Sequence, residues 1–188
     1  VDRCTEIANR YGMQSAKLDL SGNLVLLGQY YDDRNGSFTD WTVGITDPRP
    51  DNIFFRGYVM AFESGGGESI VTSGDYERYY MYSYEDGAVR VPHIIGKQGF
   101  PIGLTAAGDR YEETAHVISA TVIGASSMLC DAYATAVSVM GLEEGAAFLA
   151  SVGYKGIIFT SDNRMKTVGT VEIYDPQTYD GYKAYTAV

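Results

Sequence analysis

The sequence predicts an α+β fold, in which helices pack on a mixed or antiparallel sheet. Short apolar runs bounded by glycine and turn residues recur along its 188 residues, as expected for strands. Three other segments carry apolar residues at helical spacing. One run rich in β-branched residues, Val117–Ile123, leads through Gly124 and Ala125 into a helical segment that ends at Gly141. We expect the rest of the chain to be arranged around this strand and helix.

The expected helices cover Asp2–Tyr11, Ser126–Met140 and Leu142–Val152. Each is followed by a glycine, the residue that most often ends a helix: Gly12, Gly141 and Gly153. Ser126 or Ser127 is placed to cap the second helix, because a serine oxygen accepts a hydrogen bond from a free backbone N–H of the first turn. The third helix has two acidic residues in its first turn, where they interact favourably with the helix dipole.

The expected strands lie between Ala16 and Ile173. They cover Ala16–Leu20, Asn23–Leu27, Trp41–Ile45, Tyr58–Phe62, Ser69–Thr72, Ala88–Val91, Val117–Ile123, Gly156–Thr160 and Met165–Ile173. Asp32–Thr39 is expected to be a turn-rich loop, and Asp162-Asn163 to be the turn of the last hairpin. We therefore expect one domain over residues 1–173, followed by a tyrosine-rich arm over residues 174–188 that packs on the sheet or on a partner.

Composition limits the classes of partner. A formal net charge of −10 argues against a surface that neutralises nucleic-acid phosphates, and no apolar run is long enough to cross a bilayer. The two cysteines, Cys4 and Cys130, are too few for a disulfide framework, so we expect each to be a small buried side chain. Because the sequence starts at Val1 without a methionine or signal peptide, we expect a processed or excised product.

Two side chains of the central helix, Asp131 and Thr135, lie four positions apart and therefore on one face. A carboxylate and a hydroxyl that point the same way are hard oxygen ligands for Mg²⁺ or Ca²⁺. Mostly small or apolar residues surround them, so little else on this helix is polar. The alternative is an ordinary solvated helix face, and spacing alone does not separate the two interpretations.

Two further places carry candidate site residues. Ser73-Gly74 offers backbone N–H groups in a tight turn, and Asp75 and Arg78 bring opposite charges to it. The alternative is a plain turn with a surface ion pair. His93 follows a proline at a strand end and is expected to be accessible, in either a catalytic or a structural role. His116 has the same ambiguity.

Five segments can be compared, in order, with a known family. They are Trp41-Thr-Val-Gly-Ile-Thr-Asp-Pro48, Val71-Thr-Ser-Gly-Asp-Tyr-Glu-Arg78, His93-Ile-Ile95, Ser119-Ala-Thr-Val122 and Cys130-Asp-Ala-Tyr-Ala-Thr-Ala136, the last followed by Met140-Gly141. Each segment alone is a weak signal. In this order and spacing, over about residues 1–168, the chain resembles the ApbE-type FAD:protein FMN transferases.

The resemblance implies a reaction and a site. Enzymes of this family split FAD at its pyrophosphate, with Mg²⁺ assisting, attach FMN through a phosphoester to a Thr or Ser of an acceptor protein, and release AMP. The family's metal ligands fall on Asp131 and Thr135, and its histidine near the reacting phosphate falls on His93. Its flavin and phosphate pocket falls on Thr72, Ser73, Gly74 and Asp75. The resemblance also implies an extracytoplasmic location.

The chain departs from the family pattern in two places. The family continues its histidine as H-I-I-D-P-x-T-G, whereas Gly96-Lys97-Gln98-Gly99 follows here. The chain also begins where the family's K-G-x-x-V-D segment ends, so we expect a missing N-terminal half as a possible partner. Three alternatives to a transferase therefore stay open: a non-catalytic flavin- or nucleotide-binding relative, one chain of a split transferase that is inactive alone, and a tyrosine-rich acidic surface module.

Overall fold

The computed structural model describes residues 1–49, 58–108, 110–171, 173–174 and 186–188. The helices are α1 (Asp2–Arg10), α2 (Ser127–Met140) and α3 (Leu142–Val152). The strands are β1 (Ala16–Leu20), β2 (Asn23–Leu27), β3 (Tyr30–Asp32), β4 (Ser37–Thr39), β5 (Trp41–Thr46), β6 (Tyr58–Ser64), β7 (Glu68–Gly74), β8 (Tyr79–Tyr84), β9 (Gly87–Pro92), β10 (Leu104–Ala107), β11 (Arg110–Glu113), β12 (Val117–Gly124), β13 (Lys155–Thr160), β14 (Arg164–Val168), β15 (Ile173–Tyr174) and β16 (Thr186–Ala187).

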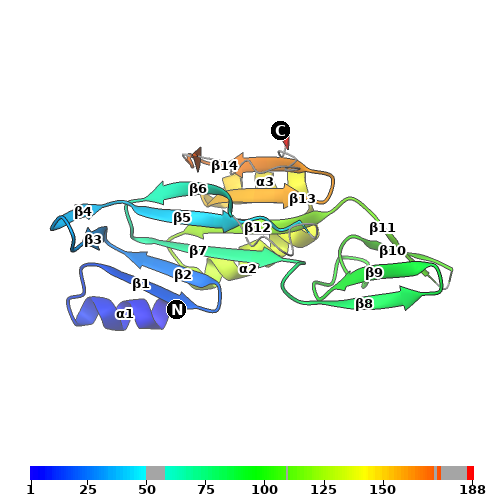
Figure 1. Ribbon diagram of the computed structural model, residues 1–188, viewed down its shortest axis with the longest axis horizontal. Helices are drawn as coiled ribbons and strands as arrows, with labels where there is room; N and C mark the ends of the chain where they lie inside the picture. Colours follow the sequence, from blue (N-terminus) through cyan, green and yellow to red (C-terminus); the bar gives the residue numbers. More distant parts are fainter. Residues whose placement is uncertain (50–57, 109, 172, 175–185) are drawn as a thin grey trace.

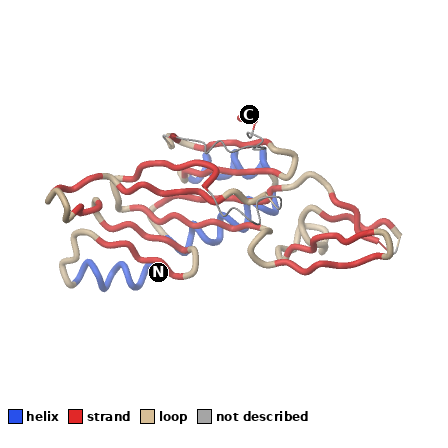
Figure 2. The backbone as a smooth tube through the Cα atoms, in the orientation of Figure 1, coloured by secondary structure: helices blue, strands red, loops and turns tan. Residues whose placement is uncertain are grey.

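The largest element is a seven-stranded sheet in the order β1-β2-β7-β12-β13-β14-β16 (Figure 1). Its neighbouring strands are antiparallel except for β14 and β16, which are parallel. Helices α2 and α3 pack on one face, and α1 lies beside β1 (Figure 2). A three-stranded sheet, β15-β6-β5, contributes to the core on the other face. The expected α+β fold is therefore confirmed.

The apolar runs at the centre of the sheet are buried on both faces. In β13, Ile158 belongs to the core under the two helices, whereas Ile157 and Phe159 belong to the core under the three-stranded sheet. Successive side chains of a strand point to opposite faces, and both faces of this sheet are covered, so all three are fully buried. A strand covered on both faces needs mostly small or apolar residues, which explains why Val117–Ile123 has only two polar side chains, Ser119 and Thr121, both fully buried.

Helix α2 is held at its start by two side chains. Ser126 caps it by accepting a hydrogen bond from the Leu129 N–H at 3.4 Å. Asp2 of α1 accepts hydrogen bonds from the Ser127 N–H at 2.7 Å and from the Ser126 hydroxyl at 2.8 Å. A carboxylate at a helix N-terminus also interacts favourably with the helix dipole, so Asp2 fixes where α2 begins.

Two hairpins, β8–β9 and β10–β11, form a separate lobe at one end of the molecule (Figure 1). Tyr84 joins them, because its hydroxyl accepts a hydrogen bond from the Tyr111 N–H at 2.7 Å and its ring lies 4.8 Å under the Arg110 guanidinium. Five of the six β8 residues are exposed, three of them tyrosines. This lobe therefore carries several of the chain's tyrosines on its surface.

Several expected boundaries are wrong. The strand expected over Met165–Ile173 ends at Val168, because Gly169 turns the chain with a φ of +72°, and β15 then pairs with β6 in the other sheet. Part of the loop expected over Asp32–Thr39 is the short hairpin β3–β4. Strands β8, β10 and β11 were not expected. Most of the predicted arm, residues 175–185, lies outside the described residues.

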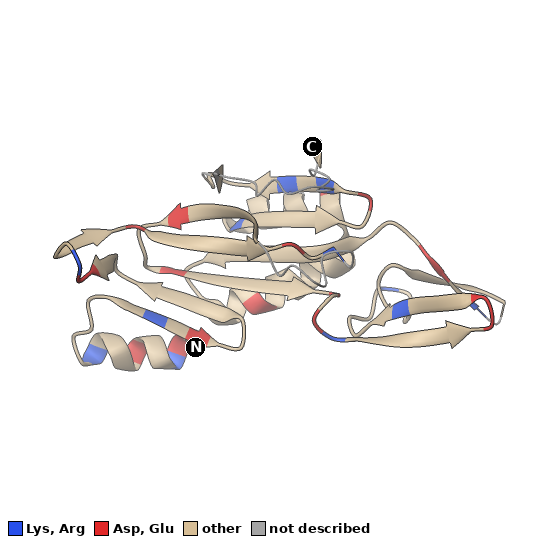
Figure 3. Ribbon diagram, in the orientation of Figure 1, with Lys and Arg blue, Asp and Glu red and all other residues tan. Residues whose placement is uncertain are grey.

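Other expectations concern burial and charge. Cys130 is fully buried as predicted, but Cys4 is exposed, because α1 buries only Ala8. Lys and Arg are interspersed with acidic residues along the described ribbon (Figure 3). Within the described ranges, no helix is both long enough and apolar enough to cross a bilayer.

Candidate functional site

A cavity of about 580 Å³ lies where the end of β7 meets α2. It is lined by side chains from β1–β2, β5, β7 and α2, together with His93 after β9. Six of the seven predicted site residues line it: Thr72, Ser73, Gly74, His93, Asp131 and Thr135. Residues separated by more than forty positions in the sequence thus line one cavity, and their roles stay a prediction.

The polar face of α2 is directed at β7. The Thr135 hydroxyl lies 3.0 Å from the Ser73 hydroxyl and also donates to the Asp131 backbone carbonyl at 3.3 Å. Asp131 and Thr135 are both exposed, so their oxygens are accessible from the cavity. Thr72 is turned toward the next strand instead, with its hydroxyl 2.8 Å from that of Thr121. The face predicted for ligands is therefore open and lines a cavity.

Gly74 is required by the ring of Tyr76. A Cβ atom at residue 74 would lie 2.3 Å from a ring carbon of Tyr76 and 3.2 Å from the Ile118 carbonyl oxygen, so no larger residue fits without a shift. Burial raises the pKa of Tyr76 to about 12, so its hydroxyl stays protonated at neutral pH. The same ring also lines a second cavity, and Tyr76 is therefore a wall between the two.

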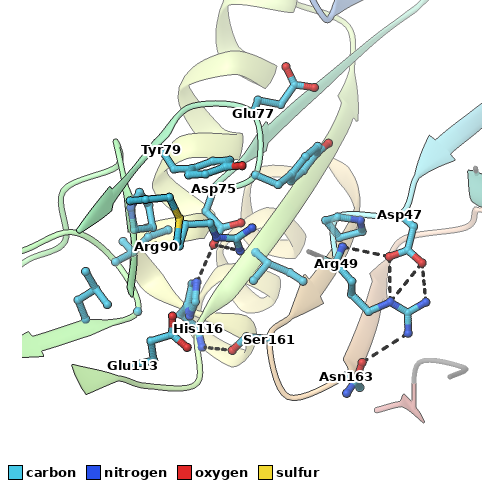
Figure 4. A pocket seen from close by; sticks show the side chains of 18 of the residues that line it. Asp47, Arg49, Asp75, Glu77, Tyr79, Arg90, Glu113, His116, Ser161 and Asn163 are labelled. Atoms are coloured by element: carbon cyan, nitrogen blue, oxygen red, sulfur yellow. Dashed lines mark hydrogen bonds and ion pairs between the residues drawn. The ribbon is translucent and has the colours of Figure 1, made fainter. Parts of the chain in front are cut away.

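The second cavity, of about 710 Å³, contains the seventh predicted residue, Asp75 (Figure 4). Its carboxylate is 1% exposed, and Oδ2 accepts hydrogen bonds from Arg90 Nη2 and His116 Nε2, both at 2.9 Å. The idea of a surface ion pair between Asp75 and Arg78 is therefore wrong. That Asp75 contacts a flavin stays a prediction, and any such contact would be made from this side of Tyr76.

His116 was left ambiguous by the sequence, and the structure gives it two acceptors. Nδ1 lies 2.8 Å from the Thr114 carbonyl oxygen, and Nε2 lies 2.9 Å from the Asp75 carboxylate. Both partners accept, so both ring nitrogens donate only when the ring is an imidazolium. Burial acts to lower the pKa of His116, but the hydrogen bonds to Asp75 and Thr114 outweigh it and raise the pKa above its ordinary value.

The opposite wall of the second cavity carries another ion pair. Arg49 Nε donates to Asp47 Oδ1 at 2.9 Å, and Arg49 Nη1 lies 3.5 Å from the Asn163 side-chain oxygen. Both charged side chains are largely buried. Figure 4 shows this pair facing the Asp75, Arg90 and His116 cluster across the cavity. The buried charges of the second cavity are thus already paired.

His93 is exposed, as predicted, and one of its nitrogens has a partner. Nδ1 lies 2.9 Å from the Arg78 carbonyl oxygen. A carbonyl only accepts, so Nδ1 carries the hydrogen and Nε2 is left with a lone pair in the neutral ring. This arrangement suits a general base at the edge of the first cavity.

Comparison with known proteins decides the family. The model of the ApbE family matches residues 1–158. The chain belongs to the ApbE family. It is 32% identical to an FAD:protein FMN transferase of Rhodobacter capsulatus, over 81% of this chain and 24% of that protein. It is 31% identical to an FAD:protein FMN transferase of Treponema pallidum, over 88% of this chain and 42% of that protein.

Solved structures of ApbE proteins have the same fold. The flavin transferase ApbE of Vibrio cholerae superposes with a TM-score of 0.60 at 27% identity, over 93% of this chain and 46% of that chain. The ApbE protein of Thermotoga maritima superposes with a TM-score of 0.66 at 24% identity, over 89% of this chain and 47% of that chain. The chain therefore spans less than half the length of these ApbE relatives.

The loop after His93, where the chain departs from the ApbE pattern, is closed by its own contacts. The Gly96 N–H donates to the Phe100 carbonyl at 2.7 Å, and Ile95 forms an isolated bridge with Pro101. Lys97 extends from the loop to Glu144 in the first turn of α3, at 2.8 Å. The loop is therefore a defined turn despite its different sequence.

The side chains of Asp131 and Thr135, predicted as metal ligands, are chemically compatible with a magnesium ion. Asp131 and Thr135 supply two hard oxygen ligands, and no group of three or more His, Cys, Asp or Glu side chains is placed to hold a metal among the described residues. Mg²⁺ is commonly bound by one or two carboxylates, with water and substrate phosphates completing its coordination. A pair of exposed oxygens in an open cavity is suited to that arrangement.

Proposed function

We propose that this chain forms the metal and phosphate side of an FAD:protein FMN transferase. In this reaction FMN passes from FAD to a Thr or Ser of an acceptor protein, and AMP is released. The observation that carries the proposal is the first cavity, which joins the Ser73 and Thr135 hydroxyls, the Asp131 carboxylate and His93. The relatives named FAD:protein FMN transferase support it.

The residues suggest a role for each group. The acceptor hydroxyl attacks the flavin-side phosphorus, the bond from that phosphorus to the bridging oxygen breaks, and the bridging oxygen leaves with AMP. His93 Nε2 is free to take the proton of the attacking hydroxyl. Because the Thr135 hydroxyl donates to the Asp131 carbonyl, the Ser73 hydroxyl donates to Thr135 and would orient its oxygen, and Asp131 and Thr135 would hold Mg²⁺. A bound Mg²⁺ would neutralise charge on the pyrophosphate oxygens as the leaving group departs.

A thermal-shift experiment tests the binding step. We expect FAD with Mg²⁺ to raise the melting temperature, since a ligand at one hundred times its Kd adds about 2.7 kcal/mol. The rise should disappear in Asp131→Ala and persist in Glu112→Ala, which removes an exposed carboxylate of β11 outside both cavities. An equal rise in the two variants, or no rise with the original chain, would count against the site.

A mass measurement tests the transfer step. The chain, alone and together with the rest of its protein, is incubated with FAD, Mg²⁺ and an acceptor domain that bears the threonine. The proposal predicts that the acceptor gains the mass of one FMN phosphoester and that AMP appears in equal amount. From the resemblance to the family, we also propose that the reaction takes place outside the cytoplasm. Cell fractionation would check this location.

The loop after His93 favours one second candidate, a relative that binds flavin without transferring it. The loop lacks the Asp, Pro and Thr of the family pattern. A chain that shows the thermal shift but never modifies an acceptor, even with the rest of its protein present, would be such a binder.

A further inference from the structure

The larger cavity takes no part in the chemistry assigned to the smaller one, yet the two share a wall. Tyr76, Glu77 and Thr46 line both cavities. Pro92 lines the larger cavity, and the next residue, His93, lines the smaller one. The candidate base therefore lies at the boundary between the two. A transferase of the proposed kind has two substrates. The two cavities of this chain meet at His93, where the transfer would occur.

The inner wall of the larger cavity has hydrogen-bonding capacity that is not used. Asp75 Oδ1 is buried and has no hydrogen-bond partner among the described residues. Arg90 gives one of its five N–H groups to Asp75 Oδ2, and its guanidinium lies 5.5 Å from the centroid of the Tyr79 ring. An unpaired acceptor beside a guanidinium is complementary to a peptide group, whose N–H donates and whose carbonyl accepts.

Charge disfavours a dinucleotide in this cavity. Seven charged or titratable side chains line it: Asp47, Asp75, Glu77, Glu113, Arg49, Arg90 and His116. Even with His116 protonated, four carboxylates exceed three cations, and the two carboxylates at the exposed positions, Glu77 and Glu113, lie outside the buried pairs. The smaller cavity is also acidic, with Asp19, Glu77 and Asp131 against Arg78, but there the proposed Mg²⁺ at Asp131 would offset the charge of a pyrophosphate. In the larger cavity the Asp47 and Asp75 carboxylates are already paired with arginines, so an uncharged peptide segment suits it better than a pyrophosphate.

The outer wall suits an extended segment. Tyr79 and Met81, two positions apart on β8, both line the cavity and are 41% and 57% exposed. Ala88 on the paired strand β9 lines it as well and is also exposed. Aromatic and methionine side chains beside unused hydrogen-bonding groups are typical of surfaces that bind polypeptide.

From these contacts we infer that the larger cavity binds the segment of the acceptor protein that carries the modified Ser or Thr. The inference rests on the proposed function, because it assigns the second substrate of the same reaction. The segment lies against Tyr79 and Met81, its backbone pairs with Asp75 and Arg90, and its hydroxyl is presented to His93. The smaller cavity is thereby left for the dinucleotide and its metal.

NMR titration of the ¹⁵N-labelled chain tests the assignment with two separate probes. The first probe is a pool of synthetic peptides, each with one central threonine and randomised neutral flanks. We expect it to shift the amide signals of Asp75, Tyr79, Arg90 and His116. The second probe, FAD with Mg²⁺, should shift Ser73 and Thr135 instead. Absence of the second response would overturn the proposed function, whereas absence of the first would overturn only the acceptor site.

A matched pair of variants sharpens the test. Ala88→Trp places a large side chain in the larger cavity, and Ala106→Trp places the same side chain on exposed β10 of the same lobe, outside both cavities. The apparent affinity for the peptide pool should fall at least tenfold in Ala88→Trp and be kept in Ala106→Trp, with the response to FAD and Mg²⁺ unchanged in both. Ala88→Arg serves if the tryptophan variant gives a poorly dispersed spectrum. Equal peptide affinity in all variants, or a peptide response confined to the smaller cavity, would refute the acceptor site.

Discussion

The two cavities on either side of Tyr76 are opposites in chemistry although they share a wall. The smaller one presents the exposed Thr135 hydroxyl and the Asp131 carboxylate, which has no ion pair with any described residue, so it is suited to a ligand that brings its own positive charge. The larger one is lined by buried ion pairs, Asp47 with Arg49 and Asp75 with Arg90. The comparison shows how two residues of one short segment, Ser73 and Asp75, serve different sites, because β7 ends at Gly74 and the chain bends at Asp75.

The largest expected effect is on the rate of FMN transfer when His93, at the boundary between the two cavities, is replaced. His93→Ala should lower the rate of FMN transfer by about 10²-fold to 10⁴-fold, the usual contribution of a general base. Because the His93 side chain is exposed and its hydrogen bond is to the Arg78 backbone carbonyl, folding should be unaffected. Single-turnover transfer assays measure the rate, and the thermal shift with FAD and Mg²⁺ measures binding. A loss of the thermal shift together with the rate would assign His93 to binding instead.

An intermediate effect is expected on the stability of the fold when a methyl group is added at Gly74, against the Tyr76 ring that separates the cavities. Gly74→Ala drives a methyl group into the Tyr76 ring and should destabilise the fold by about 1–3 kcal/mol, as overpacking generally does. Chemical denaturation measures the change. The matched control is Gly65→Ala, whose new Cβ would meet only Asp40 Oδ1, at an ordinary 3.6 Å. Equal stability of the two variants would show that Tyr76 moves aside at no cost.

The smallest expected effect is a pH dependence of stability that comes from His116, which lines the larger cavity. The folded-state pKa of His116 is raised, so its stabilising contribution is complete below the unfolded value, near 6.5, and is lost as pH rises through the folded value. The groups facing it are Asp75, which favours the charged ring, and Arg90, which opposes it.

Melting temperatures between pH 5.5 and 8.5 measure this dependence. We expect the decline with rising pH to be shallower in His116→Gln than in the original chain. His93→Gln, measured in parallel, gives the contribution of the other histidine. Parallel curves for His116→Gln and the original chain would contradict the charged pair with Asp75.

The parts predicted correctly from sequence are those whose physical cause is local. Ser126 marks the start of α2 because it caps its own helix, and Gly153 ends α3 in the left-handed conformation. The run Val117–Ile123 is recognisable as a strand because it is rich in β-branched residues and ends at Gly124. The spacing of Asp131 and Thr135 likewise fixes their common face, whatever surrounds the helix.

The parts missed depend on contacts between distant segments. Strand β8 is mostly exposed, so its tyrosines show no alternation that would indicate a strand. His116 meets Asp75 across 41 residues, and Arg90 meets it across 15, so neither pairing leaves a local signal. The one available hint was the position of Asp75, directly after a glycine at the end of a buried strand, where a polar side chain has to find a partner.

The position of β7 in the sheet also sets the order in which the chain can fold. Strands β12, β13 and β14 are joined through α2, α3 and a short turn, so they can assemble from neighbouring segments. Strand β7 pairs with β2 on one side and with β12 on the other, each across an intervening stretch of some forty residues. Contacts between segments so far apart form slowly, because the loop between them has to be closed first. Thr135 is thus expected to be in place before Ser73 arrives, and the smaller cavity takes shape in one of the last steps of folding.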